Sequence, residues 1–320
     1  MRVLVTGGAG FIGSHLTRRI LSLGYRVVVV DDLSTGCVAN VPSGAEFLSL
    51  DLAEPGFVNR LPGGPFDAVC HLAAQSSGEV SFDDPDRDFH VNAVSTLALS
   101  RWCLKRGIPR FLYASSMAVY GDVRDLPASE DSPLCPLSYY GVSKLASEQI
   151  LRLAQREGLA TTALRMFSVY GPGQNLENLR QGMVSIFLAY LIRQAPIPVK
   201  GSLDRFRDFV YIDDVVDAWV RALQREQVSR GSPAIYNLGS GQPTTVRRLL
   251  DLLIMSLGFT PGEYPVYQDG ETPGDQFGVY ADIRRLRQEL GWEPRTRLED
   301  GLQVMVDWAR GPHAPMETRN

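Results

Sequence analysis

Short apolar runs alternate with longer segments of helical period through the first half of the chain, and this rhythm restricts the fold more than any other feature. The four valines at 27–30 have no polar residue between them, which is typical of a strand buried on both faces of a parallel sheet. Strands are expected at residues 3–6, 26–30, 46–50, 68–72, 111–115 and 162–167, and the clearest helices at 12–23, 87–106 and 139–157. The pattern predicts an α/β fold with a doubly wound parallel sheet covered by helices.

The rhythm breaks after residue 167, where turn residues gather and the apolar runs become shorter. Helices are still expected at 181–193, 213–225, 245–256, 282–290 and 298–309. They predict a smaller C-terminal α/β lobe facing the carboxyl ends of the strands, where open α/β sheets bind ligands. We expect residues 1–167 to form the sheet domain and 168–310 mainly the smaller lobe, with some segments returning to the sheet. Residues 311–320 are expected to form a polar tail.

The composition is that of an ordinary globular protein, with 44% hydrophobic and 21% charged residues. A net charge of −4 argues against a nucleic-acid partner, since such proteins usually present a basic face. No apolar run approaches the ~20 residues that span a bilayer, and the apolar run at 3–5 follows Met1 too closely for a signal peptide. The four cysteines are scattered, without a CxxC pair. A cytoplasmic, reduced protein without a metal or membrane partner is expected.

A glycine-rich turn, Gly7-xx-Gly10-xx-Gly13, follows the first expected strand and opens the first expected helix. Glycines there let backbone N–H groups approach a pyrophosphate at the amino end of a helix. Asp31 closes the second strand, where an acid accepts hydrogen bonds from ribose hydroxyls and repels a 2′-phosphate. The alternative is a plain turn with a capping acid. Loop and acid together predict a Rossmann-type site for NAD rather than NADP.

Two further strand ends point toward the same site. Asp51 ends the third strand, although a surface-loop acid is a comparable interpretation of that residue. Ala73 and Ala74 follow the fourth strand, where their small side chains allow a flat cofactor to lie close to the backbone.

Tyr140 and Lys144 stand one helical turn apart, so their side chains project to the same side of the expected helix. A nearby ammonium favours the phenolate and should lower the tyrosine pKa, and a positively charged nicotinamide should lower it further. Such a tyrosine can remove a proton from a hydroxyl. Ser116 precedes the pair and can donate a hydrogen bond to the reacting oxygen, whereas strand alternation turns Ser115 toward the opposite face. A surface ion-pair motif is the common alternative for an isolated match.

At these residues the chain resembles the extended short-chain dehydrogenase/reductases that act on nucleotide sugars, in particular the UDP-hexose 4-epimerases. The resemblance extends over nearly the whole chain. Its motifs are GGAGFIGSH (7–15), DDLSTG (31–36), HLAAQ (71–75), SSMAVYGD (115–122), YYGVSK (139–144), SVYGPG (168–173), RDFVYIDD (207–214), NLGSG (237–241) and ELGW (289–292).

The resemblance implies an NAD-dependent 4-epimerase of a UDP-hexose that forms a homodimer, with catalytic residues Tyr140, Lys144 and Ser116. Asn92 is expected to touch the nicotinamide end of the cofactor. The implied cofactor contacts are Gly7, Gly10, Phe11, Ile12, Gly13, Asp31, Asp32, Ser34, Gly36, Asp51, Leu52, Leu72, Ala73, Ala74, Gln75, Asn92, Ser115, Tyr140, Lys144, Phe167 and Val169. The implied substrate contacts are Ser116, Tyr140, Ser168, Arg207 and Asp275. Arg207 would hold the diphosphate, because its fork matches phosphate oxygens; a salt bridge to a nearby acid is the alternative.

Several positions depart from the family pattern. Epimerases of the UDP-galactose type usually carry asparagine where this chain has Ser168, and an arginine where it has Thr272. Glucuronate epimerases carry an arginine where this chain has Gly173, and its lack favours a neutral hexose.

The nearest alternatives within the family are a UDP-glucuronate epimerase, a 4,6-dehydratase and a reductase. Dehydratases carry an acid pair where this chain has Met117 and Ala118, so the proton shuttle of an elimination is lost. A non-catalytic nucleotide-binding scaffold is the alternative from another class. Apolar residues on more than one face of the 87–106 helix, namely Leu97, Leu99, Trp102 and Leu104, agree with a dimer, although core packing would also explain them.

Overall fold

The computed structural model describes residues 1–225 and 234–311. Its central sheet follows the order β3-β2-β1-β4-β5-β6-β10, and every neighbouring pair is parallel. The strands are β1 (Arg2–Thr6), β2 (Arg26–Asp31), β3 (Glu46–Ser49), β4 (Ala68–His71), β5 (Arg110–Ser116), β6 (Ala160–Met166) and β10 (Ala234–Leu238). The order reverses between β1 and β4, which is where a doubly wound sheet binds its ligand. The six expected strands and the Rossmann-type sheet are confirmed.

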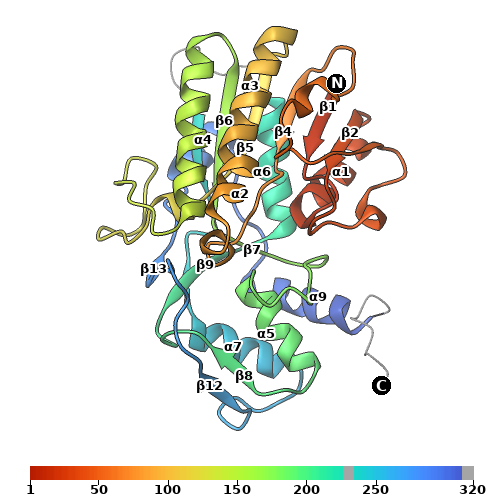
Figure 1. The fold of residues 1–320 in the computed structure, drawn as a ribbon. Helices are drawn as coiled ribbons and strands as arrows, with labels where there is room; N and C mark the ends of the chain where they lie inside the picture. The colour runs from red at the N-terminus through yellow and green to blue at the C-terminus, as the bar shows by residue number, and fades with distance from the viewer. Residues whose placement is uncertain (226–233, 312–320) are drawn as a thin grey trace.

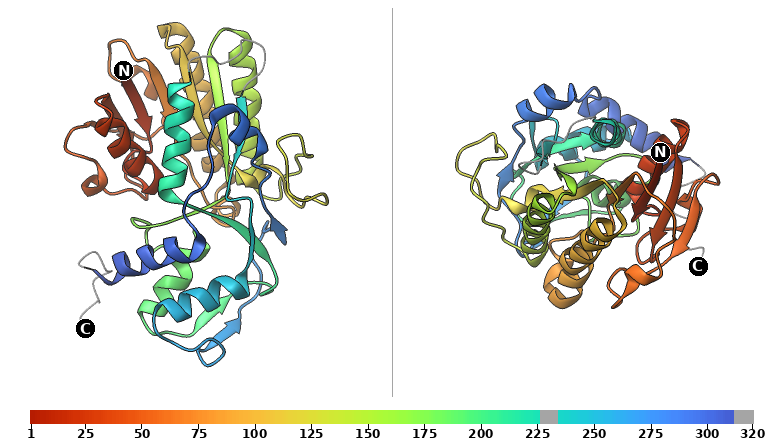
Figure 2. Two further views of the ribbon diagram at one scale, coloured as in Figure 1. Left: turned by 180° about the vertical axis from the view of Figure 1, so that it is seen from behind. Right: turned by 90° about the horizontal axis from the view of Figure 1, so that it is seen from above.

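Helices cover both faces of this sheet (Figures 1 and 2). One face carries α1 (Phe11–Ser22), α6 (Ile212–Gln224) and α8 (Arg284–Leu290), and the other carries α2 (Pro85–Phe89), α3 (Ser95–Arg106) and α4 (Tyr139–Arg156). The single helix expected at 87–106 consists of α2 and α3, joined by a π-helical turn at His90–Val94. Short 3-10 turns lie at Val38–Asn40, Phe57–Asn59, Val80–Phe82 and Met117–Val119.

A smaller lobe lies below the carboxyl ends of the strands (Figure 1). Its second sheet joins β7 (Ser168–Tyr170), β9 (Phe206–Tyr211), β11 (Pro243–Thr245) and β13 (Gly278–Val279), while β8 (Ile197–Val199) pairs with β12 (Val266–Gln268). The helices are α5 (Met183–Ile192), α7 (Val246–Ser256) and α9 (Leu298–Arg310). β10 and α6 return from this half of the chain to the main sheet. Of the tail expected at 311–320, residues 312–320 lie outside the described residues.

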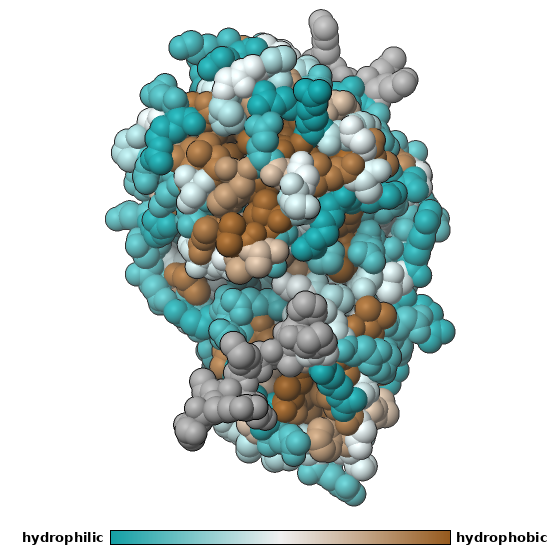
Figure 3. Space-filling model, turned by 90° about the vertical axis from the view of Figure 1, so that its right-hand side faces the viewer, coloured by the Kyte–Doolittle hydropathy of each residue, from teal (hydrophilic) through white to brown (hydrophobic). Residues whose placement is uncertain are grey.

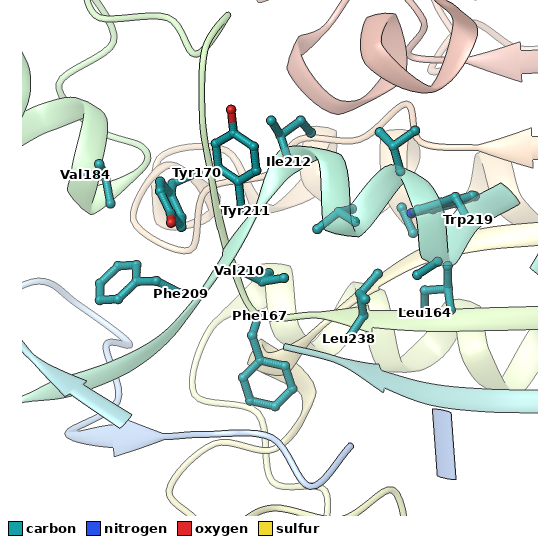
Figure 4. Packing of buried hydrophobic residues seen from close by; sticks show 14 of the residues in the cluster. Leu164, Phe167, Tyr170, Val184, Phe209, Val210, Tyr211, Ile212, Trp219 and Leu238 are labelled. Atoms are coloured by element: carbon teal, nitrogen blue, oxygen red, sulfur yellow. The ribbon is translucent and has the colours of Figure 1, made fainter. Parts of the chain in front are cut away.

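One apolar core runs from the sheet into the smaller lobe (Figure 4). Leu164 of β6, Leu238 of β10 and Trp219 of α6 are fully buried in it. The same cluster includes Phe209 of β9 and Val184 of α5, which lie in the smaller lobe. β9 of the smaller lobe continues directly into α6 on the main sheet, and one core contains residues of both lobes. The two lobes are therefore held in a fixed relative position.

The surface seen in Figure 3 is mostly hydrophilic, and apolar side chains gather mainly in its upper half. Within residues 1–225 and 234–311, no helix combines the length and the apolar character that a bilayer crossing requires. The same part of the chain contains no group of three histidine, cysteine or acidic side chains placed to hold a metal ion.

Candidate active site

The glycine-rich turn packs so closely that side chains have no room. Gly7 has a φ of +72°, and a Cβ there would lie 2.6 Å from the backbone nitrogen of Ala73. A Cβ on Gly13 would lie 2.1 Å from the carbonyl oxygen of Gly7. Gly10 caps α1 without any side-chain hydrogen bond, so the first N–H groups of the helix remain available to a ligand. These features fit the pyrophosphate of a dinucleotide at the amino end of α1.

Asp31 holds this loop in place while it borders the cavity beside it. The Asp31 carboxylate accepts hydrogen bonds from the backbone N–H of Ala9 at 2.9 Å and of Leu33 at 2.8 Å. Burial raises the pKa of Asp31, and these backbone donors lower it. Asp31 therefore combines the two roles considered from the sequence, because it caps the turn and also lines the candidate cofactor cavity.

A cavity of about 670 Å³ lies over the carboxyl ends of β1, β2 and β4, and we call it the first cavity. It is lined by most of the expected cofactor residues, namely Gly7, Gly10, Phe11, Ile12, Gly13, Asp31, Asp32, Ser34, Asp51, Leu52, Leu72, Ala73, Ala74, Gln75, Tyr140 and Lys144. Five expected residues do not line it: Gly36, Asn92, Ser115, Phe167 and Val169. Sequence reasoning missed Arg87, whose guanidinium lies 3.2 Å from Asp51 and 3.5 Å from Asp32.

Tyr140 owes its position to the start of α4. The Ser138 hydroxyl accepts a hydrogen bond from the Gly141 N–H and so begins the helix. A Cβ on Gly141 would lie 2.5 Å from the Ala118 carbonyl oxygen, so only glycine lets α4 approach the turn that follows β5. This approach places the Tyr140 phenol beside the Ser116 side chain, which lowers the pKa of the phenol.

Lys144 lies beneath Tyr140, 2% exposed, and its Nζ donates to the Ala114 carbonyl oxygen at 2.9 Å. Its Nζ is 5.6 Å from the centroid of the Tyr140 ring. Burial lowers the pKa of Lys144 to about 7, partly opposed by Asp88. Burial likewise raises the pKa of Tyr140 to about 12, against the hydrogen bond with Ser116. Burial therefore dominates the pKa of Tyr140, and the lowering expected from Lys144 together with a nicotinamide stays a prediction for the protein with its cofactor bound.

Asn92 lies behind the first cavity, in the π-helical turn, and is 1% exposed. Its amide donates to the Gln75 carbonyl, the Asp88 carboxylate and the Ser143 hydroxyl at 3.0–3.2 Å. Its own oxygen has no hydrogen-bond partner among the described residues. Asp88, fully buried, also accepts from Ser143 and Gln75. Sequence reasoning missed Asp88, since nothing in the local pattern marks it.

Ser115 turns away from Tyr140, as strand alternation predicted. Its hydroxyl donates to Glu148 at 2.5 Å. Glu148 in turn accepts two hydrogen bonds from Arg165, at 2.9 and 2.7 Å, and both side chains are almost fully buried. The Ser115 hydroxyl is therefore committed to a buried network and is not available to a ligand.

A second cavity of about 560 Å³ adjoins the first and extends toward the smaller lobe. All five expected substrate residues line it: Ser116, Tyr140, Ser168, Arg207 and Asp275. Ser115, Phe167 and Val169 lie here as well. Tyr140 lines both cavities, so its phenol stands where a cofactor in one would meet a substrate in the other. Gly173 lines the first cavity.

Asp275 forms ion pairs with two arginines at the far end of the second cavity, Arg207 and Arg205. Sequence reasoning identified Arg207 and missed Arg205. A signal was present, because residues two apart at the start of a strand face the same side. Lys200 and Arg180 also line this cavity, and Glu79 forms an ion pair with each.

Residues 3–239 match the model of the NAD dependent epimerase/dehydratase family. A UDP-glucose 4-epimerase of Mycolicibacterium smegmatis is 35% identical over 97% of this chain and 99% of its own length. The crystal structure of Thermotoga maritima UDP-glucose 4-epimerase with UDP-glucose superposes with a TM-score of 0.89, at 35% identity, covering 97% of this chain and 99% of that one.

Two further structures show how closely the relatives cover this chain. The Thermus thermophilus UDP-glucose 4-epimerase complex with NAD has a TM-score of 0.88 at 35% identity, covering 98% of this chain and 100% of that one. An NAD-dependent NDP-hexosamine 5,6-dehydratase of tunicamycin biosynthesis has a TM-score of 0.85 at 32% identity, covering 96% and 97%. The chain belongs to the NAD dependent epimerase/dehydratase family. It is an NAD-dependent epimerase of the extended short-chain dehydrogenase/reductase type, similar to UDP-glucose 4-epimerases.

Proposed function

We propose that the protein inverts carbon 4 of a UDP-hexose, with UDP-glucose and UDP-galactose as the pair it interconverts. The observation that carries the proposal is the place of Tyr140, which lies at the junction of the two cavities and beside Ser116. Relatives that are named UDP-glucose 4-epimerases over their full length support the choice of substrate.

The residues around Tyr140 can perform the proton transfers that this reaction needs. Tyr140 takes the proton of the C4 hydroxyl as that carbon is oxidised, and returns it to the new hydroxyl afterwards. Ser116 donates a hydrogen bond to the same oxygen and stabilises the charge that develops on it. NAD, when bound, supplies hydride acceptance and return at C4. A positively charged nicotinamide close to Tyr140 would lower the pKa of this phenol, which burial raises to about 12.

The first cavity has the groups that hold NAD. The free N–H groups at the start of α1 would hold the pyrophosphate, and Asp31, which lines the same cavity, would accept hydrogen bonds from the adenosine ribose. Lys144 lies beside Tyr140 on the floor of this cavity, where its ammonium can donate to the nicotinamide ribose.

The side chains that follow Ser116 argue against a dehydratase. Met117 and Ala118 line the second cavity where an elimination would need an acid and a base. Two of the carboxylates on its wall are engaged elsewhere, Glu79 with Lys200 and Asp275 with the two arginines. The dehydratase among the structural relatives makes elimination the second candidate, and the test below separates the two.

The test is incubation with UDP-glucose carrying deuterium at C4, with no added reductant. An epimerase returns the hydride that it took, so UDP-galactose should form with the label still at C4, and solvent deuterium should not enter that position. Mass spectrometry and proton NMR of the separated sugars measure both. Migration of the label to C6, or exchange of the C5 hydrogen with solvent, would instead establish a dehydratase.

A further inference from the structure

Arg205 stands immediately before β9, two residues ahead of Arg207, and lines the same cavity. Phe206 between them turns to the opposite side, where its ring packs against Phe277 and Tyr280 with centroids 6.2 and 6.4 Å apart. The alternation of the extended backbone therefore presents two guanidinium groups to one end of the second cavity.

Arg205 and Arg207 differ in the number of guanidinium N–H donors that no protein acceptor engages. The Arg207 guanidinium donates to the carbonyl oxygens of Phe206, Phe277 and Gln276 and to Asp275, which leaves only its Nε–H. Arg205 donates to the carbonyl oxygens of Lys200 and Ser202 and to Asp275, which leaves one N–H on each terminal nitrogen. Within the described residues, Arg205 thus has more donors left for a ligand than Arg207.

The charge at this end of the cavity also favours an anion. The side chains of Arg205 and Arg207 are 10% and 5% exposed, so water solvates them poorly. One carboxylate, Asp275, is paired with both, and at 27% exposed it is the most open of the three. The charged side chains that line the whole cavity are four cations, Arg180, Lys200, Arg205 and Arg207, and three carboxylates, Glu79, Asp269 and Asp275. They leave a net positive charge, which a diphosphate would neutralise.

We propose that Arg205 is the second arginine of a diphosphate subsite and that it binds the substrate phosphates together with Arg207. Arg205 would bind the phosphates in place of the arginine that UDP-galactose-type epimerases usually carry at the position of Thr272. Thr272 lines the same cavity. This inference rests on the proposed function, because that substrate carries a diphosphate. The alternative is a purely structural Arg205 that holds the turn at Lys200 and Ser202.

Calorimetric titration of Arg205→Gln with UDP and with uridine separates these roles. The dissociation constant for UDP should rise about ten- to a hundredfold, while that for uridine, which has no phosphate, should stay within twofold of wild type. Adding Thr272→Arg to this variant should recover most of the affinity for UDP. Arg193→Gln, an exposed arginine after α5, is the matched control and should bind both ligands as wild type does.

Equal weakening of UDP and uridine in Arg205→Gln, or no weakening of either, would overturn the inference. Arg205→Lys keeps the charge if the glutamine variant is too unstable to titrate. It should weaken UDP several-fold and leave uridine unchanged, since an ammonium lacks the guanidinium fork, and wild-type affinity for UDP would count against the proposal. If the protein binds UDP through Arg205 but does not convert UDP-glucose, the proposed function is wrong and the diphosphate subsite stands. Wild-type protein that binds neither UDP, GDP nor dTDP would contradict the diphosphate subsite itself.

Discussion

Tyr140 shows how one side chain depends on residues that take no part in the chemistry. Ser138 starts the helix, and Gly141 allows it to approach the turn after β5, so that phenol and Ser116 hydroxyl meet. Neither residue is distinctive in the sequence, yet each has a role that few other residue types could fill.

Replacing Tyr140 by Phe should lower turnover of UDP-glucose by about 10²–10⁴-fold, since only the proton-transferring hydroxyl is lost. Bound NAD, measured after denaturation of the purified protein, should remain at the wild-type level. Tyr139→Phe is the control, because the neighbouring tyrosine is 44% exposed and lines neither cavity. Turnover within tenfold of wild type in Tyr140→Phe would remove this residue from the mechanism.

The buried Lys144 should make stability depend on pH. Its pKa falls from 10.5 to about 7 on folding, so below pH 7 the folded state carries the full cost of a buried ammonium. Between pH 7 and 10.5 the folded lysine is neutral while the unfolded lysine is still protonated, so stability rises with pH.

The measurement is urea unfolding of NAD-free Lys144→Met and wild type at pH 7, 8 and 9. The stability of wild type relative to the variant should rise by about 1.4 kcal/mol per pH unit in that window. Lys105→Met, an exposed lysine of α3, should show no such slope. A slope of zero for Lys144→Met would mean that the ammonium stays charged in the fold.

At the scale of elements, the sequence predicted the six strands of the first half and eight helical segments, one of which, at 87–106, consists of α2 and α3 in the structure. Apolar periodicity decides elements of this kind. It did not predict the strands after residue 167, which are two to six residues long. β10 is the clearest case, since its place beside β6 depends on a pairing between residues far apart in the chain. Short strands of this kind are defined by their partners more than by their own pattern.

The candidate site shows the same contrast between residues that local motifs mark and residues that only tertiary packing brings together. Sixteen of the cofactor contacts that the family resemblance implied line the first cavity, because most of them belong to motifs at strand ends and at the starts of α1 and α4. Arg87 and Asp88 come from a helix brought to the cavity by tertiary packing, and no local motif marks either. Arg205 was detectable through its spacing from Arg207, but only once β9 was known to begin at Phe206.

The buried pair Glu148–Arg165 ties α4 to β6 and, through Ser115, to β5. Arg165→Met should cost about 3–5 kcal/mol of unfolding free energy, because Glu148 would be left as an unpaired buried charge. Adding Glu148→Leu should recover much of that loss. Arg101→Met removes an exposed α3–α4 pair, with Glu157, and should cost less than about 1 kcal/mol in the same denaturant titrations. Similar costs for the two single variants would contradict this account of the buried pair.

At the scale of the whole molecule, α3 and α4 lie side by side on one face of the sheet with their outer surfaces unpacked (Figures 1 and 2). Leu99 and Trp102, two of the apolar residues expected to favour a dimer, are buried in the core instead. Exposed apolar residues nevertheless remain on both helices: Leu97 on α3 is 46% exposed, and Val142 and Leu153 on α4 are 40% and 53% exposed. Helices with apolar residues on two sides usually pack against two partners.

We therefore expect two copies of the chain to pair through α3 and α4 as an isologous dimer. Multi-angle light scattering at micromolar concentration should give twice the 35.3 kDa mass of the chain. Glutamate at both Leu97 and Leu153 should produce monomers, since each copy would bury two unpaired carboxylates in the interface. Val304→Glu, on α9 and 48% exposed, is the matched control and should remain dimeric. Wild-type protein that scatters as a monomer, or a dimer that survives both glutamates, would place the interface elsewhere or remove it.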